Sequence, residues 1–315
     1  MKRKLVFLLI VTLVPILGAS QGIVKRVKKE TPKKEKTTTK KNTTNSNTKG
    51  TQNSKPQNSQ KDNIQEFTVR NVKYKIANSS KKHVVLSSWK NASGKIDIPS
   101  SVNCNGVDYT VTEIGASAFY ECDGLTSVYI PNTVTKINDS AFFNSRDLIN
   151  VEIPSSVTSI GRWAFCDCRR LTNVVIPNSV TSIGYNAFCW CSSLTSITLP
   201  NSVTRIERGV FYDCSSIKSV TIPNSVTSIG DEAFSNCSGL TSVIIPNSIT
   251  SIGYNAFSGC SGLTSIIIPN SVTEIGDEVF YDCINLKSAS IPSRLMNRKD
   301  EIFKNCPNLT TIKAI

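Results

Sequence analysis

Apolar and polar positions recur along this chain with a fixed period of 23 residues, in eight successive units between Val111 and Arg294. The clearest unit spans residues 226–248 and keeps these landmarks: Val226, Ile229-Gly230, Ala233-Phe234, Cys237, Leu240, Val243 and Ile245-Pro246. A constant period of this length predicts a solenoid, because each unit is one turn of chain that covers its apolar face with the next turn. We therefore expect a long side wall, which favours binding over catalysis.

Each unit predicts one short strand. In the segment 240–245 the apolar side chains alternate, so that Val243 and Ile245 face inward while Ser242 and Ile244 face outward. Pro246 ends this strand because it has no N–H to donate to a neighbouring strand.

A second extended stretch, Val226 to Gly230, ends in a glycine, for which the expected reason is a positive φ angle. Two units replace this glycine, with Asn138 and Glu207. Since asparagine tolerates positive φ, we expect local strain at Glu207.

A single unit cannot fold alone. Burying six larger apolar side chains contributes about 10 to 18 kcal/mol, whereas fixing the backbone costs about 1 to 2 kcal/mol for each residue. Stacking of neighbouring units supplies the missing stabilisation, so the array is expected to fold cooperatively. Both ends of the array then require caps. Residues 66–110 are expected to form the N-terminal cap, with strand-like runs at Phe67 to Ile76 and Val84 to Leu86, and residues 295–315 the C-terminal cap. The predicted fold class is a β-rich solenoid of about nine coils of 23 residues, eight regular ones at 111–294 and a terminal one.

The first 65 residues differ from the repeats. Residues 1–20 combine Lys2, Arg3 and Lys4 with an apolar run from Leu5 to Leu17, which predicts a secretory signal peptide too short to span a membrane. Residues 21–65 are rich in Lys, Thr and Asn and are expected to form a disordered linker. We therefore expect an exported protein, in the extracellular space, at the cell surface or in the periplasm, without a transmembrane segment.

The net charge of +13 comes mostly from residues 1–65. The signal contributes +3, and residues 21–65 contribute +9 from 12 Lys and Arg against three acids, which leaves +1 for residues 66–315. The linker is either a solvated spacer or an electrostatic tether to anionic envelope polymers. It lacks the aromatic residues on which bases stack, so nucleic-acid binding is not expected.

Cysteine recurs at one slot of successive units, which predicts a buried structural ladder. The ladder comprises Cys122, Cys168, Cys191, Cys214, Cys237, Cys260, Cys283 and Cys306, with Ser145 in one unit. Cys166 and Cys189 share another slot in adjacent units, and stacked backbones about 4.8 Å apart suit either a disulfide or an unbridged pair. Alternate residues of an extended segment point to opposite sides, so the Cys-x-Cys pairs do not predict zinc, and no metal or cofactor is expected.

The units share strings such as Ile176-Pro177-Asn178-Ser179-Val180-Thr181-Ser182-Ile183-Gly184, followed by Ala187-Phe188, Cys191, Leu194 and Ile197. This pattern resembles the leucine-rich repeats of the BspA-like (Treponema pallidum type) family, over about residues 96–315. The resemblance implies a curved leucine-rich-repeat solenoid that is secreted or displayed at a cell surface. It also implies protein binding, in adhesion, host-matrix binding or aggregation between cells, and it brings no catalytic residues.

Two sets of residues are candidates for ligand binding. The first is an apolar group among the outward positions of the predicted strands: Val175, Ile244 and Ile267. The second lies in the variable slots after the glycine and after the phenylalanine of the third to fifth units: Arg162, Trp163, Arg169, Arg170, Tyr185, Trp190, Arg205, Arg208 and Tyr212. Large aromatic side chains beside arginine often carry interface energy, although a tryptophan can also simply cover a turn.

Catalysis is not expected. His83 is the one histidine of the chain, so no Ser-His-Asp triad or histidine-based metal site stands out. The carboxylate pairs Asp231-Glu232 and Asp277-Glu278 recur at one slot, as solvent-facing residues do, which makes a secreted hydrolase a remote alternative. The expected function is capture of a protein or glycan ligand, host matrix included, at the cell envelope. The main alternative is a periplasmic or extracellular scaffold that organises other envelope proteins.

Overall fold

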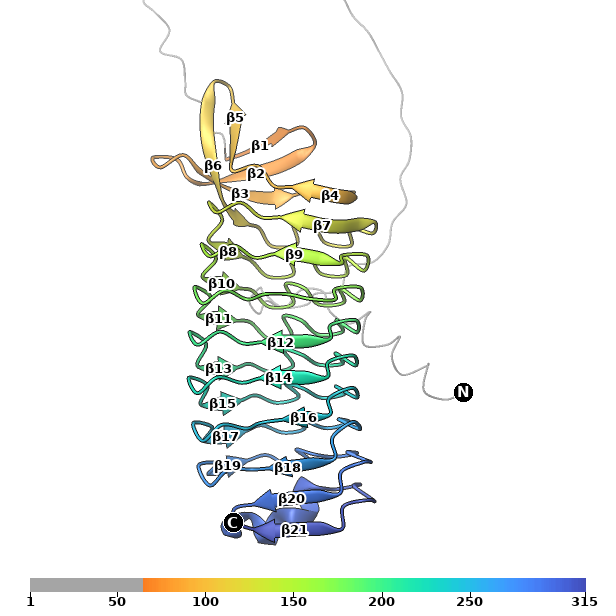
Figure 1. Ribbon diagram of the computed structural model, residues 1–315. Helices are drawn as coiled ribbons and strands as arrows, with labels where there is room; N and C mark the ends of the chain where they lie inside the picture. Colours follow the sequence, from red (N-terminus) through yellow and green to blue (C-terminus); the bar gives the residue numbers. More distant parts are fainter. Residues whose placement is uncertain (1–64) are drawn as a thin grey trace, which may run out of the picture. The chain divides into compact units, whose positions relative to one another are not determined.

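Two columns of short parallel strands run along a stack of coils in the computed structural model, which describes residues 65–315 (Figure 1). Strands of neighbouring coils pair at a separation of 23 residues: Ser196 lies opposite Ser219, and Ser219 lies opposite Ser242. The predicted β-solenoid with a 23-residue repeat is therefore confirmed. The signal peptide predicted at 1–20 and residues 21–64 of the predicted linker lie outside the described residues.

One column, which we call the glycine column, consists of strands that end just before the repeated glycine slot. Its strands are β6 (Val107–Ile114), β8 (Lys136–Ile137), β10 (Ser159–Ile160), β11 (Ser182–Ile183), β13 (Arg205–Ile206), β15 (Ser228–Ile229), β17 (Ser251–Ile252) and β19 (Glu274–Ile275). The isoleucine that ends each strand points into the core.

The other column, which we call the proline column, consists of strands followed by the repeated proline, plus the final strand. Its strands are β4 (Gly94–Asp97), β7 (Leu125–Tyr129), β9 (Asn150–Glu152), β12 (Ser196–Thr198), β14 (Ser219–Thr221), β16 (Ser242–Val243), β18 (Ser265–Ile267), β20 (Ser288–Ile291) and β21 (Thr311–Ala314). Successive side chains point to opposite faces. In β14, for example, Val220 is buried while Ser219 and Thr221 are exposed.

The N-terminal end of the stack departs from the repeat. β1 (Glu66–Val69), β2 (Val72–Asn78) and β3 (His83–Ser88) pair antiparallel in that order, and β3 pairs parallel with β6. The strand-like run predicted from Phe67 to Ile76 consists of β1 and β2, joined as a hairpin because Arg70 and Asn71 turn the chain with φ angles of 48° and 66°. Repeat-like stacking already begins inside the predicted cap, since β4 pairs parallel with β7.

The remaining irregular elements lie at the two ends of the stack (Figure 1). β5 (Ser101–Cys104) forms a hairpin with β6 near the N-terminal end. The 3-10 helix η1 (Ser293–Arg298) and the short helix α2 (Lys299–Ile302) precede β21 at the C-terminal end. The boundaries of the two caps stay predictions.

A column of stacked phenylalanine rings forms the centre of the core. Ring centroids of successive coils lie 4.9 to 5.8 Å apart, with the rings within 17° of parallel. The rings belong to Phe119, Phe142, Phe165, Phe188, Phe211, Phe234, Phe257, Phe280 and Phe303. Each inner ring therefore combines complete burial with contact to an aromatic neighbour on both sides.

The cysteine slot closes each coil with a hydrogen bond to the coil before it. The thiol of Cys191 donates to the carbonyl oxygen of Phe165 (3.2 Å), and the hydroxyl of Ser145 makes the same bond to Phe119 (2.7 Å). Seven of the eight ladder cysteines are buried, and all eight are free thiols. Burial raises the pKa of the Cys237 thiol to about 12, so it stays protonated at neutral pH. The predicted structural ladder is confirmed.

The repeated glycine is required by close approach between coils and not by its φ angle. Gly230 and its equivalents lie outside the positive-φ region. A Cβ atom on Gly276 would lie 2.5 Å from the backbone nitrogen of Tyr254 and 2.8 Å from the carbonyl carbon of Gly253. At position 276 the space beside the preceding coil therefore admits only a hydrogen atom. The predicted positive φ was wrong, because a single unit does not reveal how closely the next coil approaches.

The coil that contains Glu207 interrupts the glycine column. In the other regular coils the amide at the glycine slot donates to a carbonyl one coil earlier, at 2.7 to 2.9 Å. Within the described residues Glu207 makes no such bond to Ile183, and β11 does not pair with β13. The prediction of strain from a positive φ at Glu207 was therefore wrong. The effect seen at Glu207 is instead the loss of backbone pairing between β11 and β13.

Asn138 shows why the side chain at this slot matters. Its Nδ2 donates to the carbonyl oxygen of Ile114 (2.9 Å) and to the carboxylate of Glu113 (3.0 Å), and its backbone amide keeps the ladder bond. A carboxylate only accepts hydrogen bonds. The side chain of Glu207 therefore cannot donate to the carbonyl oxygen of Ile183, as the side chain of Asn138 does to that of Ile114.

Replacing Gly276 with alanine should lower the free energy of unfolding by about 1 to 3 kcal/mol, the usual cost of overpacking. The added methyl group would collide with backbone atoms of the preceding coil. Urea titration followed by circular dichroism measures the loss. The reverse change, Glu207→Gly, is the matched control and should slow amide hydrogen exchange at position 207. An unchanged midpoint for Gly276→Ala would contradict the close-approach explanation.

Candidate functional site

The three apolar residues predicted on the strand face do not form one cluster. Val175, Ile244 and Ile267 all point outward, with 70%, 81% and 63% of their surface exposed. Ile244 and Ile267 lie in adjacent coils, but Thr198 and Thr221 occupy the same position in the two coils between them and Val175. The structure therefore presents an exposed isoleucine pair and a separate valine.

Apart from Arg205, which lies on β13, the second candidate set lies on the turn side. We define the turn side in each coil as the residues between the glycine slot and the next buried leucine (162–170 in the third coil). Two turn-side positions have a left-handed backbone: one lies two residues after the glycine slot and one directly before the ladder cysteine. Trp163 and Trp190 occupy such positions, with φ angles of 51° and 57°. The other copies of these two positions hold smaller or polar residues, among them Ser140, Asn144, Asp167, Asn186, Gly209, Asp213, Glu232 and Asn236.

Both tryptophans are therefore in an unfavourable backbone conformation. A left-handed φ is rare for bulky residues and costs on the order of 1 to 3 kcal/mol where glycine or asparagine is absent. Trp163 and Trp190 are half-buried. The same slots are filled elsewhere by asparagine or glycine, so closing the coil does not require tryptophan.

Arg162 and Tyr185 lie together at the edge of a groove of about 330 Å³ beside the glycine column. The guanidinium carbon of Arg162 lies 5.3 Å from the ring centroid of Tyr185, within range of a cation–π contact. Asp139 and Glu207 also line this groove. The interrupted ladder and two of the predicted binding residues therefore lie at the same place.

All four other arginines of the predicted set are paired with carboxylates. The shortest N–O distances are 2.6 Å for Arg169 with Asp167, 3.3 Å for Arg170 with Asp147, 3.0 Å for Arg208 with Glu232 and 3.8 Å for Arg205 with Glu207. Within residues 65–315, Arg162 is the one arginine of the predicted set that forms no ion pair. The turn side is consequently less basic than its sequence indicates.

Trp190 and Tyr212 form a second aromatic pair on the turn side. Their ring centroids lie 6.3 Å apart at an interplanar angle of 75°, an edge-to-face contact. The hydroxyl oxygen of Tyr212 accepts a hydrogen bond from Nδ2 of Asn236 (3.4 Å), and burial raises the pKa of Tyr212. The phenol is therefore held in place and neutral at physiological pH.

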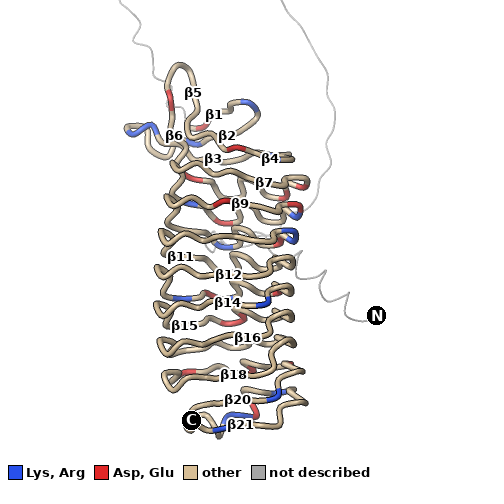
Figure 2. The backbone as a smooth tube through the Cα atoms, viewed as in Figure 1, with Lys and Arg blue, Asp and Glu red and all other residues tan. Residues whose placement is uncertain are grey.

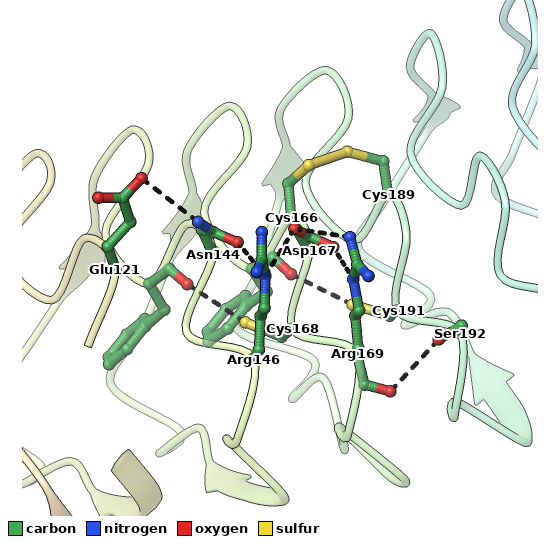
Figure 3. A network of polar contacts seen from close by, with 12 residues as sticks. Glu121, Asn144, Arg146, Cys166, Asp167, Cys168, Arg169, Cys189, Cys191 and Ser192 are labelled. Carbon is green, nitrogen blue, oxygen red and sulfur yellow. Dashed lines mark hydrogen bonds and ion pairs between the residues drawn. A yellow bond between two sulfur atoms is a disulfide. The ribbon is translucent and has the colours of Figure 1, made fainter. Parts of the chain in front are cut away.

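A disulfide and a buried carboxylate also lie on the turn side (Figure 3). Cys166 and Cys189 are joined by a disulfide, with Cα atoms 4.6 Å apart. Asp167 is only 6% exposed, and its oxygens accept from Nε of Arg169 (2.6 Å) and Nε of Arg146 (3.4 Å). This arrangement ties the second, third and fourth coils together on the turn side.

A larger groove, which the sequence did not reveal, lies on the proline column near its N-terminal end. It measures about 570 Å³ and crosses β4, β7 and β9. The outward side chains that line it are Lys95, Asp97, Ser127, Tyr129, Asn150, Glu152, Asn173 and Val175. Lys95 and Asp97 lie on β4 in register with Ser127 and Tyr129 of β7. The sequence pattern did not include them because residues 66–110 were predicted to be a cap and not part of the repeats.

Within residues 65–315 no three His, Cys, Asp or Glu side chains gather as metal ligands. His83 begins β3 and lies opposite Thr110 of β6. In the same described range no helix is both long and apolar enough to cross a bilayer.

The coils have constant length, and each carries a buried leucine ahead of a short parallel strand. This arrangement defines the leucine-rich-repeat solenoids, a class of interaction scaffolds. The BspA type leucine-rich repeat family matches residues 112–241 and 204–315, in six copies. The chain belongs to this family. Its members are typically surface or secreted proteins, and the family is in general non-catalytic and engaged in protein interaction.

Solved structures show the same architecture. A leucine-rich repeat protein from Bacteroides ovatus is 31% identical with a TM-score of 0.60, over 79% of this chain and 71% of that chain. The Treponema pallidum leucine-rich repeat protein is 28% identical with a TM-score of 0.56, over 63% of this chain and 90% of that chain. Comparison with curated proteins gives no significant match.

Proposed function

We propose that this protein is exported and captures a protein or glycan ligand outside the cell or at its surface, in adhesion, without catalysing a reaction. The binding residues are the turn-side patch, which we define as Arg162, Trp163, Tyr185, Trp190 and Tyr212. Arg169, Arg170, Arg205 and Arg208 are left out of the patch because each is already paired with a carboxylate.

The observation that carries this proposal is the left-handed backbone of Trp163 and Trp190. Strained conformations persist where the surrounding structure imposes them, and they cluster at functional sites. A tryptophan that merely covered a turn would be replaced without loss by the asparagine found at the same slot of other coils. Rigid aromatic side chains next to an arginine without an ion pair are also the residues that dominate interfaces.

The test is a double variant, Trp163→Asn with Trp190→Asn, in the mature chain. Affinity for the ligand should fall at least about tenfold, as expected for the loss of interface anchors. Stability should rise by about 1 kcal/mol or more because asparagine relieves the backbone strain. Binding is measured against arrayed matrix proteins and glycans, and stability by urea titration.

Tyr254→Ala is the matched control, since Tyr254 fills the same slot as Tyr185 three coils later and is similarly exposed, 45% against 43%. The control variant should bind normally. Unchanged binding by the tryptophan variant would remove the patch from the proposal. Complete protection of the repeats from protease on intact cells would favour the scaffold role inside the envelope over adhesion.

A further inference from the structure

Two acidic residues flank an exposed tyrosine in the groove over β4, β7 and β9. Asp97 of β4 lies opposite Tyr129 of β7, and Tyr129 lies opposite Glu152 of β9. The three residues, which we call the acidic–aromatic trio, line the groove, and Tyr129 is 50% exposed. Neighbouring strands are about 4.8 Å apart, so an acidic residue lies on either side of the phenol.

Neither carboxylate of the trio is neutralised by a neighbour. Asp97 and Glu152 form no ion pair within residues 65–315. Lys95 is the one cation among the residues that line the groove. The coils around it, residues 94–153, carry eight Asp and Glu against three Lys and Arg, a net charge of −5, and Figure 2 shows acidic positions in red on β9.

This chemistry favours an ammonium or guanidinium group. A cation over the face of a tyrosine is attracted by the ring, and a carboxylate on either side adds charge-assisted hydrogen bonds. The same carboxylates repel anionic ligands. The trio therefore fits the side chain of a lysine or an arginine.

The groove also borders an open sheet edge, because the two columns end differently near the N-terminal cap. The last strand of the glycine column there, β3, is covered by β2, which in turn pairs with β1. The last strand of the proline column, β4, pairs only with β7 among the described strands. One side of β4 is therefore available to an additional strand.

The backbone of β4 presents hydrogen-bonding groups on this open side. The amides of Gly94 and Ile98 donate to carbonyl oxygens of the next coil, at 2.7 and 3.0 Å. Backbone groups alternate between the two sides of a strand, so those of Lys95 and Asp97 point to the open side. Between them, Ile96 packs against the core but is only half-buried. An added strand therefore gains main-chain hydrogen bonds and covers an apolar side chain.

We propose that β4 and the trio bind an extended segment of another protein, in which a lysine or arginine lies between apolar residues. The segment pairs with the open side of β4 as an additional strand. Its basic side chain lies beside Asp97 and extends over the ring of Tyr129 towards Glu152, while an apolar neighbour faces inward and covers Ile96. The charged side chains on β4 disfavour pairing with a uniformly apolar strand, so the edge selects the basic residue.

This inference does not rest on the proposed adhesive function. The groove shares no residue with the turn-side patch, so binding at either surface can be lost while the other is kept.

Fluorescence anisotropy with a labelled peptide, Gly-Thr-Val-Arg-Val-Thr-Gly, titrated with the mature chain tests the proposal. Binding should be saturable, and replacing the arginine of the peptide with glutamate should weaken it at least about tenfold, because like charges then meet.

Two further peptides test strand addition separately from charge. One is N-methylated at the arginine amide and the other at both valine amides. Alternate amides of a strand face opposite sides, so one peptide should lose affinity at least about fivefold and the other should bind normally. Equal binding by the two peptides would contradict pairing with β4.

Two variants of the chain test the trio. Asp97→Lys and Tyr129→Ala should each weaken binding of the arginine peptide at least about fivefold, with an unchanged circular dichroism spectrum. Glu274→Lys is the matched control and should bind normally, because Glu274 is an exposed carboxylate on β19 that forms no ion pair in the described part of the chain.

Unchanged binding by Asp97→Lys, or no binding of the arginine peptide to the unmodified chain, would overturn the proposal. So would a neutral oligosaccharide that shifts the amide signals of Asp97 and Tyr129 in NMR while the peptide leaves them unmoved, since the groove would then be a saccharide site.

Discussion

Replacing Phe211 with alanine should lower the free energy of unfolding by about 3 to 5 kcal/mol, the range observed when a large aromatic side chain is removed from a core. Phe211 is completely buried, and its ring lies 5.8 Å from Phe188 and 5.4 Å from Phe234. The substitution leaves a cavity in the middle of the ring column and removes contacts to two coils at once. Urea titration monitored by far-UV circular dichroism measures the change.

Phe143→Ala is the control for this prediction. Phe143 has the same side chain but lies on the turn side, half-buried and stacked on Tyr120 at 5.3 Å. Its loss should cost much less than that of Phe211, about 1 kcal/mol, because the site is open to solvent and leaves no closed cavity. Equal losses for the two variants would show that the ring column is not the centre of the core.

Removing the disulfide, by Cys166→Ser with Cys189→Ser, should lower the free energy of unfolding by about 3 kcal/mol. The two cysteines are 23 residues apart, and the loop-closure relation gives about 3 kcal/mol for a loop of that size. The bond spans one whole coil, so it limits the freedom of the unfolded chain over a full repeat.

A reductant provides the control, because it should destabilise the unmodified chain to the level of the double variant and leave the variant itself unchanged. The free thiols can also be counted by alkylation under denaturing conditions without reductant. Alkylation of Cys166 and Cys189 in the unmodified chain would contradict the disulfide directly.

The sequence by itself determined the repeat architecture of this protein. Because the units have constant length, residue i stacks on residue i+23, and this one relation predicts the strand pairing of Ser196 with Ser219 and the cysteine ladder. It also places Cys166 next to Cys189. These features depend only on period and side-chain type, which are visible in the printed residues.

Only the tertiary structure decided the features that depend on the distance between coils and on backbone angles. The close approach at Gly276, the broken ladder at Glu207 and the left-handed backbone of Trp163 are of this kind. Ion pairing of the turn-side arginines and the groove around Tyr129 arise between side chains of different coils. The geometry of these features depends on the distance between neighbouring coils. The order of residues along the chain does not give that distance.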